Sequence, residues 1–264
     1  MKQILKRIVK NIVPQKILRY RFEKAVSNFS PYVIKKHLGE TEFDFLIGDI
    51  IGKDWYDTDN VGNTYEMCFI RDMMIAPGDV VFECGSHHGF TTVLLAKWAG
   101  EKGKVFAFEA SKHNYDILQK NIEINKLSNV SAYNKAVGDT KGKINISVGY
   151  NVNVVKKHDA DSVEMVPLDE FKQTIPNLIK IDVEGFEIAV LKGAHEILRT
   201  KPKLVIEVHT DLLSSYGSSV EEIFDLIGAS NYDIWIQWSP EKKPQPYKGE
   251  KISHRVHLFC LPKT

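Results

Sequence analysis

Two acidic residues lie at the ends of two consecutive apolar runs, each of which has the composition of a buried strand. Glu83 lies near the end of residues 80–84, and Glu109 ends residues 105–109. The carboxylate of Glu109 can accept hydrogen bonds from both hydroxyls of an adenosine ribose. The carboxylate of Glu83 can orient the amino-acid part of a cationic sulfonium ligand, whereas it would repel the phosphates of a dinucleotide. Together the two acids predict a nucleoside bound at the carboxyl edge of a parallel sheet.

A turn bracketed by Gly85 and Gly89 lies between these two acids. Glycine allows the backbone to turn tightly and to approach a ligand, and the first N–H groups of the following helix face whatever lies above the strand. The Gly-x-x-x-Gly spacing lacks the three-glycine cradle with which dinucleotide-binding proteins hold a pyrophosphate. We expect Ser86 and His87, which lie inside the turn, to contact the ligand.

Three polar residues at the ends of later predicted strands are candidates for the reaction itself. Asp182 and Glu184 lie at a strand-to-helix junction, and His209 follows the next predicted strand. A neutral imidazole near its ordinary pKa can accept the proton of an attacking alcohol, so His209 is our first candidate for a general base and Asp182 the second. Helix capping is the alternative role for either carboxylate.

A metal site is the other chemistry that these residue types allow. His87, His88 and His209 could combine with Asp182 and Glu207 only if the two adjacent histidines pointed the same way. Adjacent residues in a turn point in divergent directions, whereas a zinc site needs its ligands to converge on one point. We therefore expect no metal.

These residues are positioned by alternating strands and helices. From residue 76 onward, short apolar runs alternate with amphipathic segments, which is the pattern of repeated βα units. The segment 139–169 is instead extended and turn-rich, as expected for a substrate opening. Strands are predicted at 80–84, 105–109, 130–134, 178–182, 204–208, 234–238 and 254–260, with helices at 91–99, 115–125, 220–227 and from residue 186.

The first 75 residues lack this pattern, so we divide the chain into an N-terminal part, 1–75, and an α/β domain, 76–264. Apolar residues at helical spacing predict a basic amphipathic helix that ends near Pro14, followed by a helical or irregular cap. Seven basic residues and no acid lie within residues 1–22. The helix could lie on an anionic membrane surface, contact a partner, or pack on its own domain.

Composition narrows the class of protein. The formal charge of the whole chain is +1, which argues against a nucleic-acid partner. No apolar run approaches the about 20 residues of a membrane-spanning helix, and the N-terminus lacks the features of a secretory signal. Cys68, Cys84 and Cys260 are odd in number and widely separated, which fits a reducing compartment. We expect a cytoplasmic protein, with peripheral membrane contact through the basic helix as an option.

Four blocks of the chain, in order, resemble the FkbM-type methyltransferases of the class I S-adenosylmethionine (SAM) dependent superfamily. The first two are FECGSHHGFTT (82–92) and FAFEAS (106–111). The third is AVGD (136–139), and the last is LIKIDVEGFEIAVLKGAHEIL (178–198), followed by PKLVIEVH (202–209). Together they span roughly half of the chain.

The resemblance implies a Rossmann-like, seven-stranded and mostly parallel sheet with helices on both faces. It also implies transfer of a methyl group from SAM to an oxygen, usually a hydroxyl of a sugar, glycan, lipid-linked saccharide or polyketide. The chain departs from the family pattern at Glu83, where Asp is common, and at Ser86 to His88, where Ala-Asn is common. The implied cofactor-binding residues are Glu83, Gly85, Ser86, His87, Gly89, Glu109, Ala110, Ser111, Ala136 and Asp182, with Asp182, Glu184 and His209 as the catalytic candidates.

Two other functions are compatible with the sequence. An RNA methyltransferase would use the basic leader, but the sequence after the fourth strand is Asp182-Val183-Glu184-Gly185 and not the Asn/Asp-Pro-Pro-Tyr/Phe tetrad of enzymes that modify base nitrogens. A non-catalytic module that keeps the fold is the second alternative. Five aromatic residues could stack on a carbohydrate acceptor or could simply belong to the core: Trp55, Tyr56, Tyr65, Trp235 and Trp238.

Overall fold

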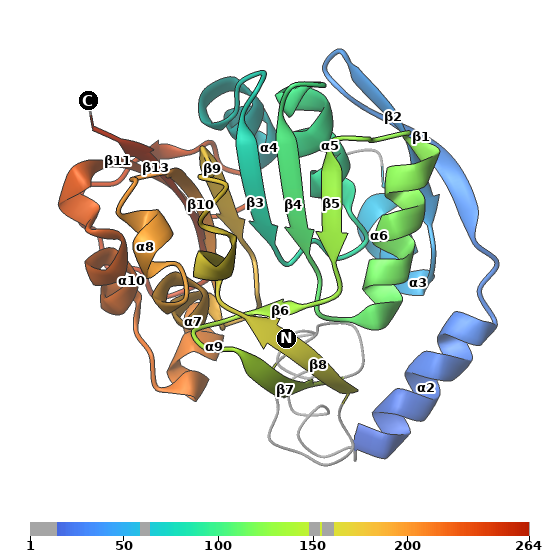
Figure 1. The fold of residues 1–264 in the computed structure, drawn as a ribbon. Helices are drawn as coiled ribbons and strands as arrows, with labels where there is room; N and C mark the ends of the chain where they lie inside the picture. The colour runs from blue at the N-terminus through green and yellow to red at the C-terminus, as the bar shows by residue number, and fades with distance from the viewer. Residues whose placement is uncertain (1–14, 59–63, 148–153, 155–160, 264) are drawn as a thin grey trace.

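The structure is a computed structural model that describes residues 15–58, 64–147, 154 and 161–263 (Figure 1). The segment 1–14, for which we predicted a basic amphipathic helix, lies outside these residues. The first described helix, α2 (Gln15–Ser27), lies in the part for which we expected a helical or irregular cap, without separate bounds for a helix there. None of the described helices combines the length and the apolar character that crossing a membrane requires.

An eight-stranded sheet forms the centre of the molecule, in the order β12-β11-β13-β10-β9-β3-β4-β5. The strands from β10 to β5 are parallel, whereas β13 runs antiparallel to both β10 and β11. This confirms the Rossmann-like, mostly parallel sheet; the strand beyond the predicted seven is the two-residue edge strand β12. The strands are β3 (Val80–Cys84), β4 (Lys104–Phe108), β5 (Val130–Tyr133), β9 (Leu178–Ile181), β10 (Lys203–Val208), β11 (Tyr232–Gln237), β12 (Gln245–Pro246) and β13 (Val256–Pro262).

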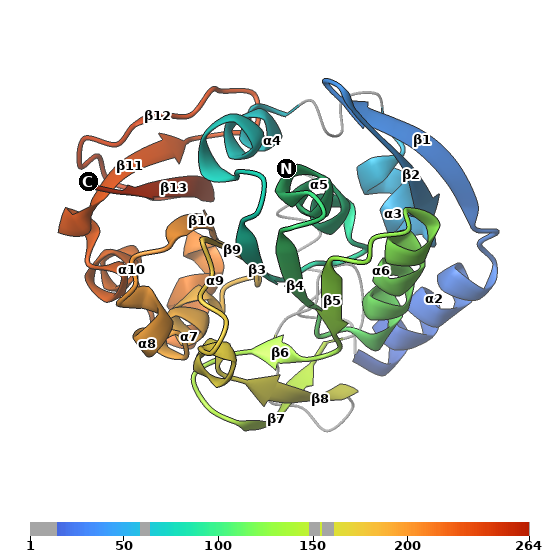
Figure 2. The ribbon, with the colours of Figure 1, turned by 45° about the horizontal axis from the view of Figure 1, so that its top comes forward.

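Helices cover both faces of this sheet, because side chains alternate along each strand. Val81 packs in the core beneath α5, whereas its neighbour Phe82 packs in the core beneath α7, α8 and α10 (Figure 2). The parallel strands are thus buried on both sides, which explains their continuous apolar sequences. The helices of these two layers are α5 (Phe90–Ala99) and α6 (Lys112–Ile124), and α7 (Glu187–Lys192), α8 (His195–Leu198) and α10 (Val220–Ile227).

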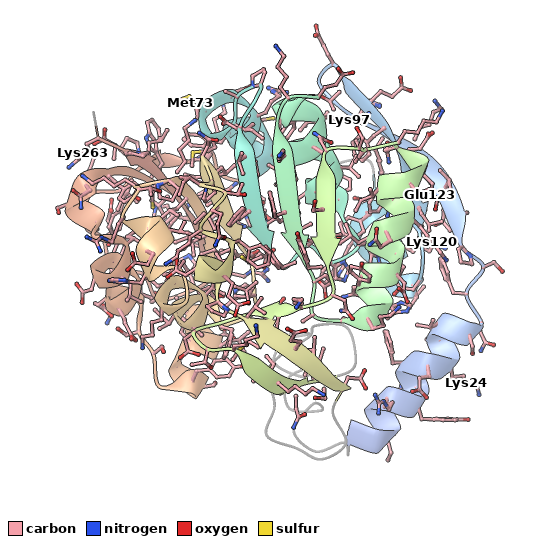
Figure 3. All side chains as sticks on the ribbon, viewed as in Figure 1. Lys24, Met73, Lys97, Lys120, Glu123 and Lys263 are labelled. Atoms are coloured by element: carbon pink, nitrogen blue, oxygen red, sulfur yellow. The ribbon has the colours of Figure 1, made fainter. Side chains whose placement is uncertain are left out.

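The helix α6 is amphipathic, as its sequence predicted. Ile117 and Leu118 are buried, whereas Lys120 and Glu123 point outward from the molecule (Figure 3). The side chain of Ser111 caps the helix by accepting the N–H of Asn114. The apolar face therefore fixes how α6 sits beside the sheet, and the cap fixes where it begins, directly after the end of β4.

The helix predicted from residue 186 is two short helices, α7 and α8, with a break at Gly193. A Cβ atom at Gly193 would lie 1.9 Å from the carbonyl oxygen of Gly138, so the two backbones touch there. Asp169 then caps α8, because its carboxylate oxygens accept the N–H groups of Glu196 and Ile197. Gly138 and Asp169 are both distant in the chain from the residues that they contact. The break between the two helices therefore could not be predicted from helical periodicity, which is a local signal.

The N-terminal part contains an antiparallel hairpin, where we had expected only helical or irregular structure. Phe43, Phe45 and Ile47 alternate along its second strand and share one core with Phe90 of α5. The alternation of these apolar residues is a strand signal that the sequence carries and that we did not use. The division at residue 75 stays a prediction. The elements here are β1 (Tyr32–Leu38), β2 (Thr41–Ile47), α3 (Ile50–Tyr56), α4 (Tyr65–Phe69) and the π-helical turn η1 (Ile70–Met74).

A small second sheet lies beyond the carboxyl ends of the central strands (Figure 1). Its order is β6-β8-β7, with β7 and β8 antiparallel. The described part of segment 139–169 is thus extended and turn-rich, as predicted. The strands are β6 (Ala136–Val137), β7 (Gly142–Ile146) and β8 (Asp161–Val166), and the remaining short elements are α9 (Thr210–Leu213), η2 (Leu168–Phe171), η3 (Ser214–Tyr216) and η4 (Ala229–Asn231).

Candidate active site

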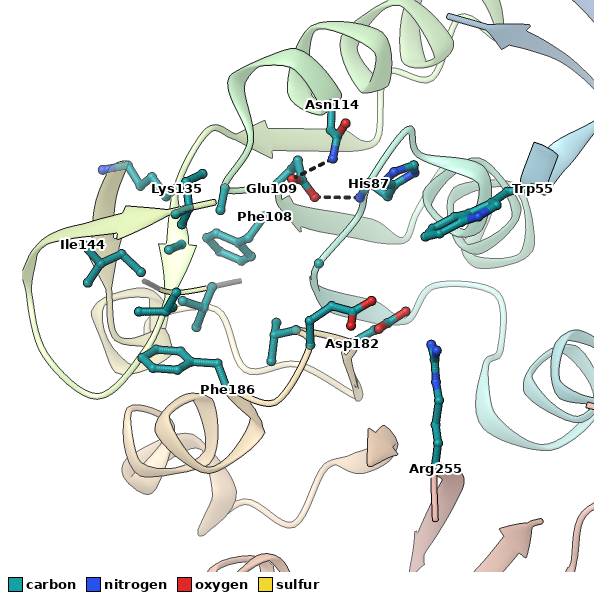
Figure 4. A pocket seen from close by; sticks show the side chains of 18 residues that line it. Trp55, His87, Phe108, Glu109, Asn114, Lys135, Ile144, Asp182, Phe186 and Arg255 are labelled. Atoms are coloured by element: carbon teal, nitrogen blue, oxygen red, sulfur yellow. Dashed lines mark hydrogen bonds between the residues drawn. The ribbon is translucent and has the colours of Figure 1, made fainter. Parts of the chain in front are cut away.

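A pocket opens at the carboxyl ends of β3, β4 and β9, next to the small sheet (Figure 4). Several chain segments contribute to its lining, including α3 of the N-terminal part and Arg255, directly before β13. Seven of the predicted site residues line it: Gly85, His87, Glu109, Ala110, Ala136, Asp182 and Glu184. Five predicted site residues do not: Glu83, Ser86, Gly89, Ser111 and His209.

Glu109 is an acid of the pocket that neighbouring donors hold in place. Its two carboxylate oxygens accept the backbone N–H groups of His87 at 2.7 Å and Ser111 at 2.8 Å, and the side-chain amide of Asn114 lies 3.4 Å away (Figure 4). Burial raises the pKa of Glu109 to about 7, against the opposing effect of these donors. The carboxylate is thereby fixed in orientation, and its oxygens keep acceptor capacity for a ligand.

The turn after β3 approaches the end of β9 closely. Gly85 has a φ of +89°, and a Cβ atom there would lie 1.8 Å from the carbonyl oxygen of Asp182. The N–H groups of Gly85 and Ser86 both donate to the carbonyl oxygen of Phe108. Glycine is required at position 85 for its left-handed conformation and for the lack of space. Through its N–H, Ser86 fixes the turn to the end of β4, and it does not line the pocket.

Glu83 lies beneath the turn and not in the pocket. Its side chain is fully buried, one oxygen accepts the hydroxyl of Thr92, and the other has no hydrogen-bond partner in the described part of the chain. Burial raises the pKa of Glu83. Gly89 is the N-cap of α5, packed against Leu118. These residues position the turn, and a direct contact with the ligand stays a prediction for them.

One wall of the pocket is apolar. Phe108 comes from β4 of the central sheet, Ala136, Val137 and Ile144 come from the small sheet, and Phe186 comes from the turn before α7. Val137 was expected beside Ala136 from the family resemblance, whereas Phe108, Ile144 and Phe186 were not predicted from the sequence. Ile144 alternates with Ile146 on β7, a strand signal that could have pointed to them.

Asp182 faces the pocket among several charges. Burial and the neighbouring Glu207 raise the pKa of Asp182 to about 7, although the ammonium group of Lys180, 3.3 Å away, opposes the shift. A carboxyl group that titrates near neutral pH can hold or release a proton under physiological conditions. The geometry therefore allows a proton-accepting role for Asp182.

His209 lies behind Asp182 and is 2% exposed. Its Nδ1 is 2.7 Å from a carboxylate oxygen of Glu187, and its Nε2 is 3.7 Å from Glu184. Burial works against the charged form, but the Glu187 hydrogen bond and the nearby carboxylates raise the pKa of His209 to about 9. The imidazole is protonated at neutral pH, which differs from the neutral base that we expected from the sequence.

Two residues at the pocket rim were not among the predicted site residues. The ring of Trp55, on α3, is 41% exposed and stacks on His87 with 4.9 Å between ring centroids. Arg255, which Figure 4 labels at the pocket, is half-exposed and pairs with Glu207. Of the five aromatic residues that we considered for stacking, Trp55 lines the pocket. Tyr56 is next to it, with its hydroxyl 2.9 Å from Nδ1 of His87.

The described residues contain two groups of side chains with the composition of a metal site. One consists of Asp182, Glu207 and His209, and the other of Asp49, His88 and His113. The first is surrounded by cations, because Lys180 contacts Asp182 while Arg255 and His257 contact Glu207. These cations already balance the carboxylates of the first group, which leaves little attraction for a metal ion.

Comparisons with known proteins agree with this geometry. The family model described as a methyltransferase FkbM domain matches residues 83–234, more than half of the chain. The hexuronic acid methyltransferase AglP of Haloferax volcanii is 26% identical over 159 residues, which cover 54% of this chain and 64% of that protein. The structure of methyltransferase FkbM from Methylobacillus flagellatus KT matches with a TM-score of 0.53 at 19% identity, over 75% of this chain and 48% of that chain.

The two matched proteins establish less than the family model does. The match covers less than two thirds of the length of either protein, and the likeness to the solved structure concerns the fold alone. The family model is the stronger finding, because its matched region includes the pocket residues from Gly85 to Phe186. The chain belongs to the FkbM methyltransferase family.

Proposed function

We propose that this protein is a SAM-dependent O-methyltransferase that acts on a sugar hydroxyl. The observation that carries the proposal is the buried carboxylate of Glu109, which two backbone N–H groups fix at the carboxyl edge of the sheet. Family membership supports the same activity.

The pocket suits the three parts of the cofactor. Glu109 can accept both ribose hydroxyls, since each of its oxygens can accept a second hydrogen bond. Ala136 and Phe186 belong to an apolar wall that suits the adenine ring. Gly85 lines the pocket with backbone atoms, which can approach the methionine part. When bound, SAM supplies a methyl group already activated by a positively charged sulfur.

The protein must then align the acceptor oxygen and receive its proton. We assign the second task to Asp182, because it lines the pocket and its pKa is raised to about 7. His209 lies behind the pocket wall and is charged at neutral pH, so we assign it a supporting role. Its cation, together with that of Lys180, keeps Asp182 and its neighbouring carboxylates in place.

The rim of the pocket supports a sugar with a carboxylate as the acceptor. The half-exposed ring of Trp55 offers a flat apolar surface of the kind on which sugar rings stack. Arg255 pairs with Glu207 through Nε and one terminal nitrogen, and its half-exposed guanidinium group has further N–H groups that can bind an acceptor carboxylate. The relative from Haloferax volcanii, whose name states that it methylates hexuronic acid, supports the same class of acceptor.

The test is binding followed by turnover. Calorimetry with S-adenosylhomocysteine should show binding to the wild type and none to Glu109→Ala, with Glu123→Ala as a matched surface control. Mass spectrometry should then detect methylated glucuronosides from a panel in which each uronic acid is paired with its neutral hexose. Methylation of RNA would support the RNA alternative, and binding without turnover on any acceptor would support a non-catalytic module.

A further inference from the structure

We propose that Asp49, His88 and His113 form a binding site for one divalent transition-metal ion, separate from the methyl-transfer pocket. The three residues come from three segments: the N-cap of α3, the turn after β3 and the first turn of α6 (Figure 1). One potential ligand atom of each lies within 4.8 Å of the others. Two imidazoles and a carboxylate are a donor set that suits Zn²⁺ and its neighbours in the first transition series.

The distances are close to those of a loaded site. The Oδ2 atom of Asp49 is 2.7 Å from Nε2 of His113 and 3.5 Å from Nε2 of His88. Ligand atoms around a tetrahedral zinc ion, with bonds of about 2.0–2.1 Å, stand roughly 3.3 Å apart. Of the two pairs that include Asp49, the one with His88 is already near this separation and the one with His113 needs to open by about 0.6 Å. The third pair, between the two imidazoles, lies within 4.8 Å.

The carboxylate is oriented for this purpose. Its Oδ1 accepts the N–H of Gly52 at 2.7 Å, which leaves Oδ2 directed at the two imidazoles. A second oxygen that is fixed in this way is typical of ligating carboxylates.

The buried position of His88 is not explained by an ordinary hydrogen-bonded pair of an aspartate and a histidine. Its side chain is 0% exposed, and apart from the 3.5 Å contact between Nε2 and Asp49 neither ring nitrogen has a hydrogen-bond partner among the described residues. Such a ring is unfavourable in the folded protein, because its N–H and its lone pair were both satisfied by water in the unfolded chain. An ion at Nε2 would provide the missing partner on the side that faces Asp49.

The surroundings of Asp49 favour a bound cation more than the surroundings of Asp182 do. Among the described residues, no lysine or arginine forms an ion pair with Asp49. His113 is partly exposed and lines a second cavity, which is formed with Phe22 and Val26 of α2. Asp49 and His88 do not line this cavity, so an ion would enter along the exposed side of His113.

The ion would connect three parts of the fold. His88 follows His87, whose N–H holds the carboxylate of Glu109. Asn121 of α6 also donates to the carbonyl oxygen of His88 and accepts the N–H of Leu46 in the hairpin. A metal at this point would therefore stabilise the turn after β3 against α3 and α6, and the role we assign to it is structural.

The experiment uses the full chain, stripped with a chelator and reloaded with Zn²⁺ or Co²⁺. We expect one zinc per chain by elemental analysis, a visible absorption band of tetrahedral Co²⁺, and a rise in the unfolding temperature on the order of 5 °C with Zn²⁺ in excess. Zinc affinity should fall about 100-fold or more in His113→Gln and in Asp49→Asn. The exposed-histidine variant His195→Gln should behave as the wild type.

Circular dichroism of the metal-free variants shows whether they are folded. His113→Gln changes a partly exposed side chain and is the primary variant, and Asp49→Asn is the second should the first not fold. A reloaded wild type without zinc above the buffer level overturns the proposal. Folded variants that bind zinc as tightly as the wild type overturn it as well. Neither readout depends on methyl transfer, so the result is independent of the proposed function.

Discussion

The α-carbon of Gly85 faces the carbonyl oxygen of Asp182 so closely that a Cβ atom would lie 1.8 Å from it. The N–H of Asp182 in turn donates to the carbonyl oxygen of Cys84 at 2.9 Å. The turn after β3 and the end of β9 are thus in direct backbone contact. This contact sets the distance between the cofactor-binding turn that we propose and the residue that we assign as the base.

Gly85→Ala should destabilise the protein by at least about 3 kcal/mol, because it adds a steric clash to the strain of a left-handed residue. Gly78→Ala is the matched control: its φ is +94°, and a Cβ atom there would meet nothing within 4 Å. That variant should cost only about 1 kcal/mol. Urea unfolding measures both, and equal losses would show that the close contact with Asp182 is not the cause.

Cofactor affinity should depend on pH through Glu109. The carboxylate form accepts the ribose hydroxyls, and its pKa is raised to about 7, so binding weakens as pH falls through 7. Affinity for S-adenosylhomocysteine should therefore drop about tenfold from pH 8 to pH 6. Glu109→Gln should bind far more weakly at both pH values and lose this dependence. A wild-type affinity that does not change over this range would contradict the assignment.

Asp182→Asn should lower kcat by about 100-fold or more, because the amide cannot accept the proton of the acceptor hydroxyl. Affinity for S-adenosylhomocysteine should stay within a few-fold of the wild type. The rate of the wild type should rise with pH through about 7, and Asp182→Asn should lose that rise. Glu184→Gln, which changes the other predicted carboxylate at this junction, is the comparison. If that variant alone loses the pH response, the two roles are exchanged.

His209 should stabilise the fold only where it is charged. Its pKa is raised from 6.5 to about 9 in the folded protein, so its contribution is complete below pH 6.5 and is lost as pH rises through 9. The shift corresponds to a contribution of about 3 kcal/mol. The difference in unfolding free energy between wild type and His209→Gln should therefore shrink from pH 6 to pH 10. A constant difference would mean that the charge of His209 does not stabilise the fold.

Trp55→Ala should raise KM for the sugar acceptor about tenfold, because a stacking surface is lost, with little change in the affinity for S-adenosylhomocysteine. Trp55→Phe keeps an aromatic face and should recover most of the loss. Steady-state kinetics with a glucuronoside measures both variants. An unchanged KM in the alanine variant would remove Trp55 from the acceptor site.

The central sheet could be predicted from the sequence because its signals are local. The predicted strand 80–84 and the helix 220–227 have the bounds of β3 and α10. Apolar runs identify strands that are buried on both faces, and a Gly or a Ser marks where the helices end or begin. Since parallel strands end at one edge, the same signals were enough to bring Gly85, Glu109 and Asp182 together.

Only the tertiary structure decided which other residues join them. Trp55 and Arg255 reach the pocket from opposite ends of the chain, and Asp49 meets His88 and His113 from a third segment. The protonation states of His209 and Asp182 also could not be predicted from the sequence. A pKa depends on burial and on charges that are close in space but distant in the chain. His209 therefore becomes a cation and Asp182 a group that titrates near neutral pH, the reverse of what their residue types suggest.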